Sequence, residues 1–190
     1  MNIIGVDASI SSTGITIYNT LEEKYYIYCY TNKLQKTAKD IYFTSPKVDI
    51  SIIKQATSHP DSFSKYMDIA DTLHGLIDEH VHDCIVCMER YSFASTGLSF
   101  SIGEFTGLLK LGFYSKGYMI EDVSPGEWKK KIVGKGNAKK NEIVEYCTGT
   151  VLREGLEFVN SANKLKKDYI EDICDSFCVC EFKNINNHQI

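Results

Sequence analysis

The first thirty residues show the apolar and polar pattern that is typical of short β-strands. Residues 2–7 form an almost wholly apolar run, and residues 14–19 and 24–30 follow a period of two. Such a period indicates strands with two distinct faces. Because short polar turns join the three segments, we expect an antiparallel meander.

Apolar residues adopt helical spacing after residue 60. This spacing predicts helices over residues 61–80, with Asp61 as N-cap, and over residues 98–115. We expect strands over residues 84–89 and 118–123. The remaining predicted elements are a helix after the capping box Ser124–Glu127, a helix capped by Asn137, a variable loop near residues 149–167 and a final helix with a core stripe from Ile170 to Phe177.

Residues 31–60 are harder to assign, because they are polar and contain five lysines and two prolines. We interpret them as an insertion whose role is open, with a short strand near Val48 to Ile53. The order of elements predicts an α/β fold, in which three antiparallel strands and then parallel strands form a mixed sheet flanked by helices. We expect residues 1–190 to form a single domain.

Composition is that of an ordinary globular protein, with 190 residues, 43% apolar and 24% charged. No apolar run approaches the roughly 20 residues of a membrane span, and no secretory leader is apparent. We therefore expect no membrane association and a cytoplasmic protein, or a nuclear one in a nucleated host. Abundant Lys, Asn, Ile and Tyr are compatible with a viral or phage origin.

We interpret the seven cysteines as small buried hydrophobic residues and not as disulfide partners, because their number is odd and most fall in apolar segments. The run from His80 to Cys87 looks like a zinc cluster. On a strand, however, Cys84 and Cys87 point to opposite faces, which argues against zinc.

Four carboxylates occupy unusual places for charged residues. Asp7 and Glu89 each end an apolar strand, and Asp172 and Asp175 lie one turn apart in the final helix. Buried carboxylates must be neutralised, hydrogen-bonded or bound to a cation. Their hard oxygen donors suit Mg²⁺. The pattern thus suggests a divalent-metal site, in which a rigid Asp7 bridges two ions.

Plainer interpretations of the same residues stay open. Asp168, Asp172 and Asp175 share a helix face that a solvated surface would also explain. Asp7 would serve equally as a turn carboxylate bonded to the backbone of residues 9–14. Glu89 would serve as a partner of Arg90 or of a lysine.

Lysines are concentrated in one stretch without acidic residues, although the net charge is −4. A solvated surface is the simplest explanation of such a cluster, and contact with phosphates is the alternative. The cluster comprises Lys129, Lys130, Lys131, Lys135, Lys139 and Lys140.

The turn from Asp7 to Gly14 also resembles the first phosphate loop of actin-like ATPases and sugar kinases. Those proteins need a second phosphate hairpin and an adenosine-binding glycine pair, and neither is found in the sequence. A nucleotide-binding module is therefore the most remote alternative.

Taken together, four blocks of sequence resemble the RuvC family of Holliday-junction resolvases, in the ribonuclease H-like superfamily. They extend, in order, from residue 3 to about residue 182. The blocks are Ile3–Asp7 with Ser12–Gly14, Met88–Arg90 with the following helix, Val123–Lys140, and Asp172–Phe177.

The resemblance implies a ribonuclease H-like mixed sheet and a homodimer that contacts through residues 98–115. It implies that Asp7, Glu89, Asp172 and Asp175 bind catalytic Mg²⁺, two ions for which Mn²⁺ can substitute. It also implies phosphate contacts by Lys129 and Lys140, and Lys135 and Lys139 lie in the same stretch. Tyr91 and Phe93 flank the family's wedge position, so either one inserts at an opened base step or both pack on the sheet.

We therefore expect a Mg²⁺-dependent endonuclease that cuts four-way DNA junctions by paired symmetric nicks through metal-activated water. One alternative is a ribonuclease H-like nuclease acting on flaps, forks, RNA–DNA hybrids or other branched DNA. Another is a junction-binding module without catalysis.

Overall fold

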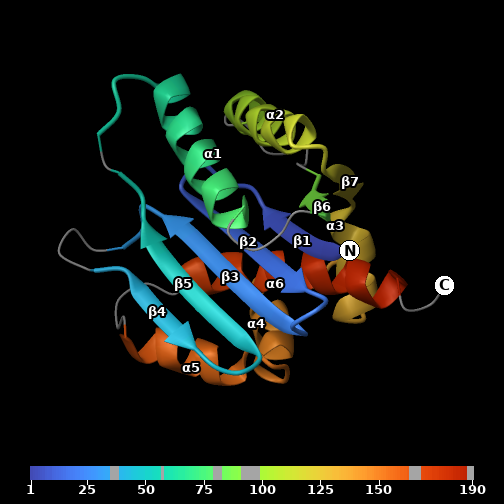
Figure 1. Ribbon diagram of the computed structural model, residues 1–190. Helices are drawn as coiled ribbons and strands as arrows, with labels where there is room; N and C mark the ends of the chain where they lie inside the picture. The colour runs from blue at the N-terminus through green and yellow to red at the C-terminus, as the bar shows by residue number, and fades with distance from the viewer. Residues whose placement is uncertain (35–38, 57, 79–82, 91–98, 163–167, 188–190) are drawn as a thin grey trace.

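A seven-stranded mixed sheet forms the centre of the computed structural model, which describes residues 1–34, 39–56, 58–78, 83–90, 99–162 and 168–187. The strand order is β4-β5-β3-β2-β1-β6-β7 (Figure 1). The strands are β1 (Asn2–Asp7), β2 (Ser12–Asn19), β3 (Lys24–Thr31), β4 (Ile41–Thr44), β5 (Val48–Lys54), β6 (Cys84–Glu89) and β7 (Met119–Val123).

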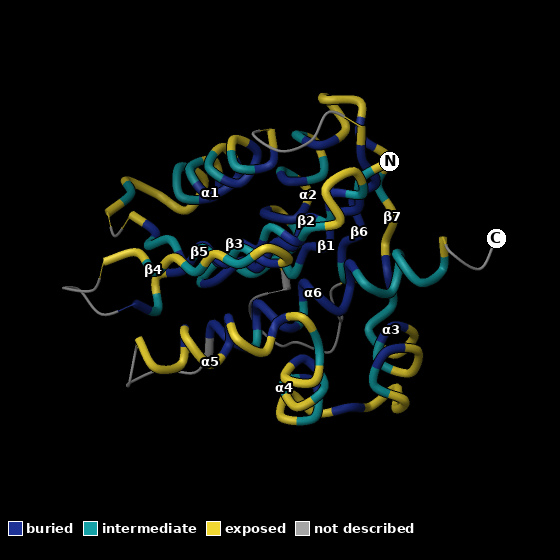
Figure 2. The backbone as a smooth tube through the Cα atoms, turned by 60° about the horizontal axis from the view of Figure 1, so that its bottom comes forward, coloured by how far each residue is buried: buried dark blue, intermediate teal, exposed yellow. Residues whose placement is uncertain are grey.

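Helices cover both faces of this sheet. Figure 2 shows α1 and α2 on one side and α3, α4, α5 and α6 on the other, with α6 directly against the strands. The helices are α1 (Ser62–Asp78), α2 (Ser99–Ser115), α3 (Pro125–Ile132), α4 (Lys140–Thr148), α5 (Arg153–Ala162) and α6 (Asp168–Asn187). None of the helices in the described ranges is long and apolar enough to cross a membrane.

The central strands confirm the predicted fold class. β1, β2 and β3 form an antiparallel meander, while β6 pairs in parallel with β1 and β7 pairs in parallel with β6. Side chains of β6 alternate between the two cores, so Cys84 packs toward α1 and α2 and Cys87 toward α6. The predicted opposite orientation of these two cysteines is confirmed.

Residues 31–60 extend the sheet beyond its meander. β5 pairs in parallel with β3, and β4 pairs antiparallel with β5 at the outer edge. The short strand expected near Val48 to Ile53 is confirmed, whereas β4 was not foreseen. The insertion is therefore part of the sheet.

The variable loop expected near residues 149–167 is wrong, because α5 occupies much of that stretch. Its buried Leu156 and Val159 pack against the extended sheet. At Gly155 an added Cβ would lie 2.5 Å from Ile50 Cδ1. Tertiary packing against β4 and β5 thus outweighs the weak helix propensity of its Gly, Asn and Ser residues.

Two glycines allow α6 to lie unusually close to the sheet. A Cβ at Gly5 would lie 2.3 Å from the backbone oxygen of Ser176, and one at Gly14 would lie 2.2 Å from that of Asp172. Thr16 Oγ1 and Ser176 Oγ add a buried hydrogen bond of 3.0 Å across the same contact. The first turns of α6 are thereby fixed over the carboxyl end of β1.

Helices α1 and α2 pack together through a third glycine. A Cβ at Gly112 would lie 2.0 Å from the ring of His74 on α1. At the start of α1, Asp61 Oδ1 accepts the backbone N–H of Ser64 at 2.7 Å, which confirms Asp61 as the N-cap.

Candidate active site

Asp7 and Glu89 end neighbouring parallel strands at the same edge of the sheet. The register pairs Val6 with Met88, so the next residue of each strand is one of the two acids. The apolar runs that precede them fill the two cores and fix both backbones. Carboxyl ends of adjacent parallel strands are a common place for polar sites in α/β proteins.

Asp172 and Asp175 approach the same edge from α6. Because Gly14 pairs with Asp7 across β1 and β2, the backbone contact of Gly14 with Asp172 sets that helix turn beside Asp7. Asp172 is 5% exposed and Asp175 is half-buried. The alternative of a plain solvated helix face is therefore wrong for these two residues. The side chain of Asp168 lies outside the described residues.

The four carboxylates act on one another electrostatically. Burial, followed by the charges of Asp175, Asp172 and Glu89, raises the pKa of Asp7 well above its usual value. Burial and the charge of Glu89 raise the pKa of Asp175 to about 7. The sequence-predicted acids thus lie near enough to repel one another, and a bound cation would offset this repulsion.

Neighbouring polar groups offset part of this burial. Trp128 Nε1 donates to Glu89 Oε2 at 2.8 Å, which lowers the raised pKa of Glu89. Lys33 Nζ lies 3.1 Å from Asp172 Oδ2, and a hydrogen bond from Ser12 also favours the charged Asp172. Glu89 was expected to pair with Arg90 or a lysine in the simplest reading, but its hydrogen-bond donor is the indole of Trp128.

Two of the four predicted DNA-binding lysines lie beside the carboxylates. The charge of Lys140 lowers the pKa of all four, and that of Lys129 lowers those of Glu89 and Asp175. Lys129 Nζ lies 5.2 Å from the centre of the Trp128 ring, and Lys140 Nζ lies 2.6 Å from Glu171 Oε2. Both ammonium groups therefore lie near enough to the carboxylates to favour their charged forms.

The other two lysines are exposed on the segment that leads into α4. Lys135 Nζ pairs with Glu142 Oε1 at 2.6 Å, and the N–H of Lys139 donates to Glu142 Oε2 at 2.9 Å. Lys139 is therefore the N-cap residue of α4, and the expected cap at Asn137 is wrong. The turn that contains Gly134 and Gly136 precedes this cap, and the side chain of Ala138 between them is buried. Tyr91 and Phe93 lie outside the described residues.

The four carboxylates are candidate ligands for the expected Mg²⁺. Within the described ranges, no group of three or more His, Cys, Asp or Glu side chains is drawn together tightly enough to hold a metal ion as it stands. The four carboxylates nevertheless suit Mg²⁺, because they supply hard oxygen ligands from strands and a helix. The pKa of each of the four is raised, as expected for buried acids. Asp7, Glu89, Asp172 and Asp175 are the residues that would hold it.

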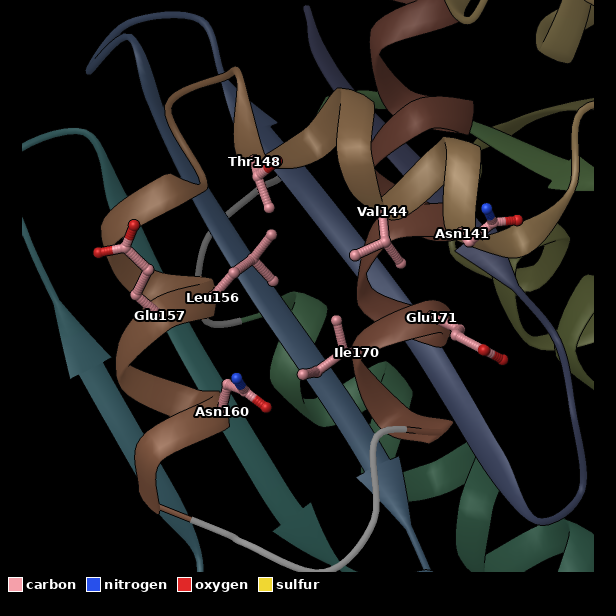
Figure 3. A pocket seen from close by; sticks show the side chains of 8 residues that line it. All are labelled: Asn141, Val144, Thr148, Leu156, Glu157, Asn160, Ile170 and Glu171. Atoms are coloured by element: carbon pink, nitrogen blue, oxygen red, sulfur yellow. The ribbon is translucent and has the colours of Figure 1, made fainter.

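A separate pocket of about 360 Å³ lies between α4, α5 and α6. Figure 3 shows Val144, Leu156 and Ile170 lining it, together with Glu171, whose carboxylate pairs with Lys140. None of the four carboxylates belongs to its described lining. This pocket is therefore distinct from the candidate site at the sheet edge.

Sequence reasoning missed Lys33 and Trp128. Lys33 follows β3, and the predicted meander returns the end of β3 to the edge that carries Asp7. The predicted topology could therefore have indicated that Lys33 lies near Asp7. Trp128 is the only tryptophan, and its buried indole requires a hydrogen-bond acceptor. The identity of that acceptor, 39 positions away, had no local signal.

The fold and the carboxylate cluster define the class of this protein. A mixed sheet with three antiparallel strands followed by parallel ones, crossed by a helix that brings acids to the end of the first strand, is a ribonuclease H-like architecture.

Comparison with known proteins narrows this class. No protein-family model matches the chain. The chain is 28% identical over 123 residues to crossover junction endodeoxyribonuclease RuvC of Chlamydia abortus, covering 64% of this chain and 69% of that protein. It is 24% identical over 145 residues to the protein of the same name from Prochlorococcus marinus, covering 76% of this chain and 78% of that one.

Solved structures agree with these sequence relatives. RuvC of Thermus thermophilus matches with a TM-score of 0.59 and 13% identity, over 98% of this chain and 97% of that one. The same protein in complex with Holliday junction substrate gives 0.58 and 14%, over 98% and 96%. The yeast mitochondrial Holliday junction resolvase Ydc2 gives 0.54 and 15%, over 98% and 83%. The chain has the RuvC fold, and parts of its sequence are similar to RuvC proteins.

Proposed function

We propose that this protein is a metal-dependent endonuclease that resolves four-way DNA junctions by paired symmetric nicks. The observation that carries the proposal is the approach of Asp7, Glu89, Asp172 and Asp175 to one edge of a RuvC-like sheet. The substrate class comes from the relatives, which are named as crossover junction endodeoxyribonucleases. One structural neighbour was solved with a Holliday junction.

Within this proposal the four acids hold the catalytic cations. Asp7 is fixed by a central strand and would be the most rigid of the residues that hold Mg²⁺, two ions in this proposal, for which Mn²⁺ would substitute. When bound, Mg²⁺ lowers the pKa of water and neutralises charge that develops on a phosphate. Trp128 orients the carboxylate of Glu89 by its hydrogen bond, and Ser12 does the same for Asp172. We expect the cleavage to leave 5′-phosphate and 3′-hydroxyl ends.

The basic residues of α3, of α4 and of the segment between them would bind the DNA backbone. Lys129 and Lys140 lie beside the carboxylates and suit the phosphates nearest the cut. Lys135 and Lys139 are exposed on the segment between α3 and α4 and suit phosphates of an adjoining arm. Such contacts supply affinity and salt dependence without sequence information. Tyr91 and Phe93 stay candidates for separating base pairs at the crossing point.

Two opposed strands must be cut, which favours a homodimer with two sites. The surface of α1 and α2 that faces away from the sheet suits the contact, because it exposes large apolar side chains around a groove of about 420 Å³. Added Cβ atoms at Gly103 and Gly107 would meet open space, so a partner helix can approach closely. The exposed apolar residues are Phe63, Met67, Phe100, Leu111 and Tyr114.

A panel of labelled substrates tests the proposed specificity. Equal concentrations of a mobile four-way junction, a flap, a fork, an RNA–DNA hybrid and a linear duplex are incubated with protein and Mg²⁺. A resolvase converts the junction to paired nicked duplexes and cuts the other substrates far more slowly. Preference for a flap, fork or hybrid would instead indicate a different nuclease of the same class. Junction binding without any product would indicate a binding module. With this activity we expect the protein in the cytoplasm, or in the nucleus of a nucleated host, and a viral or phage origin stays the alternative.

A further inference from the structure

Lys33 is the one cation within direct ion-pair distance of the four acids in the described ranges. Its Nζ lies 3.1 Å from Oδ2 of Asp172, and the two side chains are 22% and 7% exposed. Lys129 and Lys140 act on the acids over longer distances, and Lys140 has its own carboxylate partner in Glu171. Lys33 therefore contacts the carboxylates more directly than Lys129 and Lys140 do.

The backbone around Lys33 is firmly held. The N–H of Lys33 donates to Thr31 Oγ1 at 3.0 Å, and the N–H of Asn32 donates to the carbonyl oxygen of Ser11 at 3.0 Å. Ser11 lies in the turn that follows Asp7, so these bonds join the lysine segment to the site itself. The contact is thus built into the fold and is unlike that of a freely moving surface lysine.

The inserted strands support this arrangement from the other side. Gln55, which follows β5 and is 1% exposed, donates its backbone N–H to the carbonyl oxygen of Thr31 at 2.9 Å. Its side-chain Nε2 donates to the carbonyl oxygen of Tyr30 at 2.9 Å. One role of residues 31–60 is therefore to fix the end of β3, from which Lys33 reaches Asp172.

An ammonium group and a divalent cation compete for the same carboxylate. Asp172 is one of the four acids to which the proposed function assigns the metal, and Lys33 already neutralises it. Two cations that share one carboxylate repel each other. Metal loading at Asp172 is therefore opposed as long as the lysine stays there. Its long flexible stem lets the ammonium group move to a phosphate without backbone movement.

We propose that Lys33 is a built-in counter-cation of Asp172, which divalent metal displaces and which then binds a phosphate of the DNA at the site. This inference rests on the proposed function. It gives Lys33 opposite effects on the two binding steps: it weakens metal binding to the free protein and strengthens DNA binding to the metal-loaded protein.

Lys33→Met separates the two effects, because it keeps an apolar stem and removes the charge. Mn²⁺ binding to the DNA-free protein is followed by the electron paramagnetic resonance signal of free Mn²⁺. We expect affinity about three- to tenfold tighter in the variant. Binding of a fluorescent four-way junction is measured in Ca²⁺ over a range of salt concentrations. We expect it to be about three- to tenfold weaker, with a log–log salt slope smaller by about 0.9.

Two matched variants control the experiment. Lys33→Arg keeps the charge and should retain junction affinity and the salt slope of the wild type. Lys39→Met makes the same charge change at an exposed lysine of the same insertion and should leave Mn²⁺ affinity unchanged. Structural damage would weaken both metal and junction binding, so opposite changes in Lys33→Met cannot arise from misfolding.

Unchanged or weaker Mn²⁺ binding by Lys33→Met would overturn the proposal, as would unchanged junction binding. If the wild-type protein fails to bind any junction, the proposed function fails and the phosphate half of the inference fails with it. The Mn²⁺ titration needs no DNA and still decides whether Lys33 competes for Asp172.

Discussion

Asp175 and Asp7 carry a clear electrostatic signature at the scale of single residues. Burial and neighbouring carboxylates raise the pKa of Asp175 to about 7 and that of Asp7 well above its usual value. An unfolded chain has no such burial, so its aspartates titrate near about 3.9. The folded, metal-free protein therefore binds protons at this site that the unfolded chain has already released.

This difference predicts how Asp175→Asn changes stability. Well below a pH of about 4, Asp175 is protonated in both states and costs no stability. As the pH rises to about 7, the unfolded chain ionises first, so the cost of folding grows, and it is fully present above pH 7. The variant removes that cost. In EDTA at pH 8 we expect it to melt several degrees above wild type, at about 2–4 °C per kcal/mol.

Thermal melts followed by circular dichroism check this prediction. The advantage of Asp175→Asn should shrink steadily as the pH is lowered toward 5. Asp71→Asn, at an exposed position of α1, should show little change at either pH. An advantage that does not vary with pH would refute the electrostatic explanation.

The close packing of α6 on β1 and β2 determines the site at the scale of elements. Gly5 and Gly14 let the helix backbone contact the strands, and buried polar and apolar groups of α6 then fill that face of the sheet. The same contact places Asp172 and Asp175 beside Asp7. The same helix–sheet contact therefore determines both the packing of the core and the geometry of the site.

Gly14→Ala tests this dependence. An added Cβ would lie 2.2 Å from the backbone oxygen of Asp172, so α6 must shift or the strand must distort. Overpacking of this kind typically costs about 1–3 kcal/mol. We expect a melting temperature lowered by several degrees and junction cleavage reduced by at least about tenfold. Gly75→Ala, whose added Cβ meets open space in α1, should be neutral or stabilising. Wild-type stability and cleavage in Gly14→Ala would contradict the account.

The elements also show which features a sequence can reveal. β1 and β6 were predicted with their observed ends because apolar runs stop at Asp7 and Glu89. β4 and α5 were missed because they depend on each other for burial, through Phe43 of β4 against Phe158 and Gly155 of α5. The partner of Lys33 lies 139 positions away, so no local pattern indicated their ion pair.

At the scale of the whole molecule, different sets of helices cover the two faces of the sheet: α3, α4, α5 and α6 lie on one side and α1 and α2 on the other (Figure 2). Helices α1 and α2 expose large apolar side chains. Phe63 and Leu111 line one groove there, and exposed apolar patches commonly mark protein interfaces. This surface supports the proposed homodimer contact.

Leu111→Arg should weaken that dimer. Leu111 is 61% exposed on α2, where burial of a charge against a second copy would be costly. Light scattering after size exclusion should give the mass of a dimer for wild type and a monomer for the variant at low micromolar concentration. Leu21→Arg makes the same change at a turn leucine that is 93% exposed, and should stay dimeric. A monomeric wild type would refute the dimer, and a dimeric Leu111→Arg would place the contact elsewhere.

Cleavage of a labelled mobile four-way junction is the most direct test of the central claim. Wild type with Mg²⁺, wild type with EDTA and Asp7→Asn with Mg²⁺ are compared on the same gel, with junction binding measured in parallel. We predict paired nicked duplexes from wild type with Mg²⁺ alone. Asp7→Asn should bind the junction but cut it at least about 100-fold more slowly, because a ligand of the catalytic ions is lost. Full cleavage by Asp7→Asn, or by wild type in EDTA, would contradict the account.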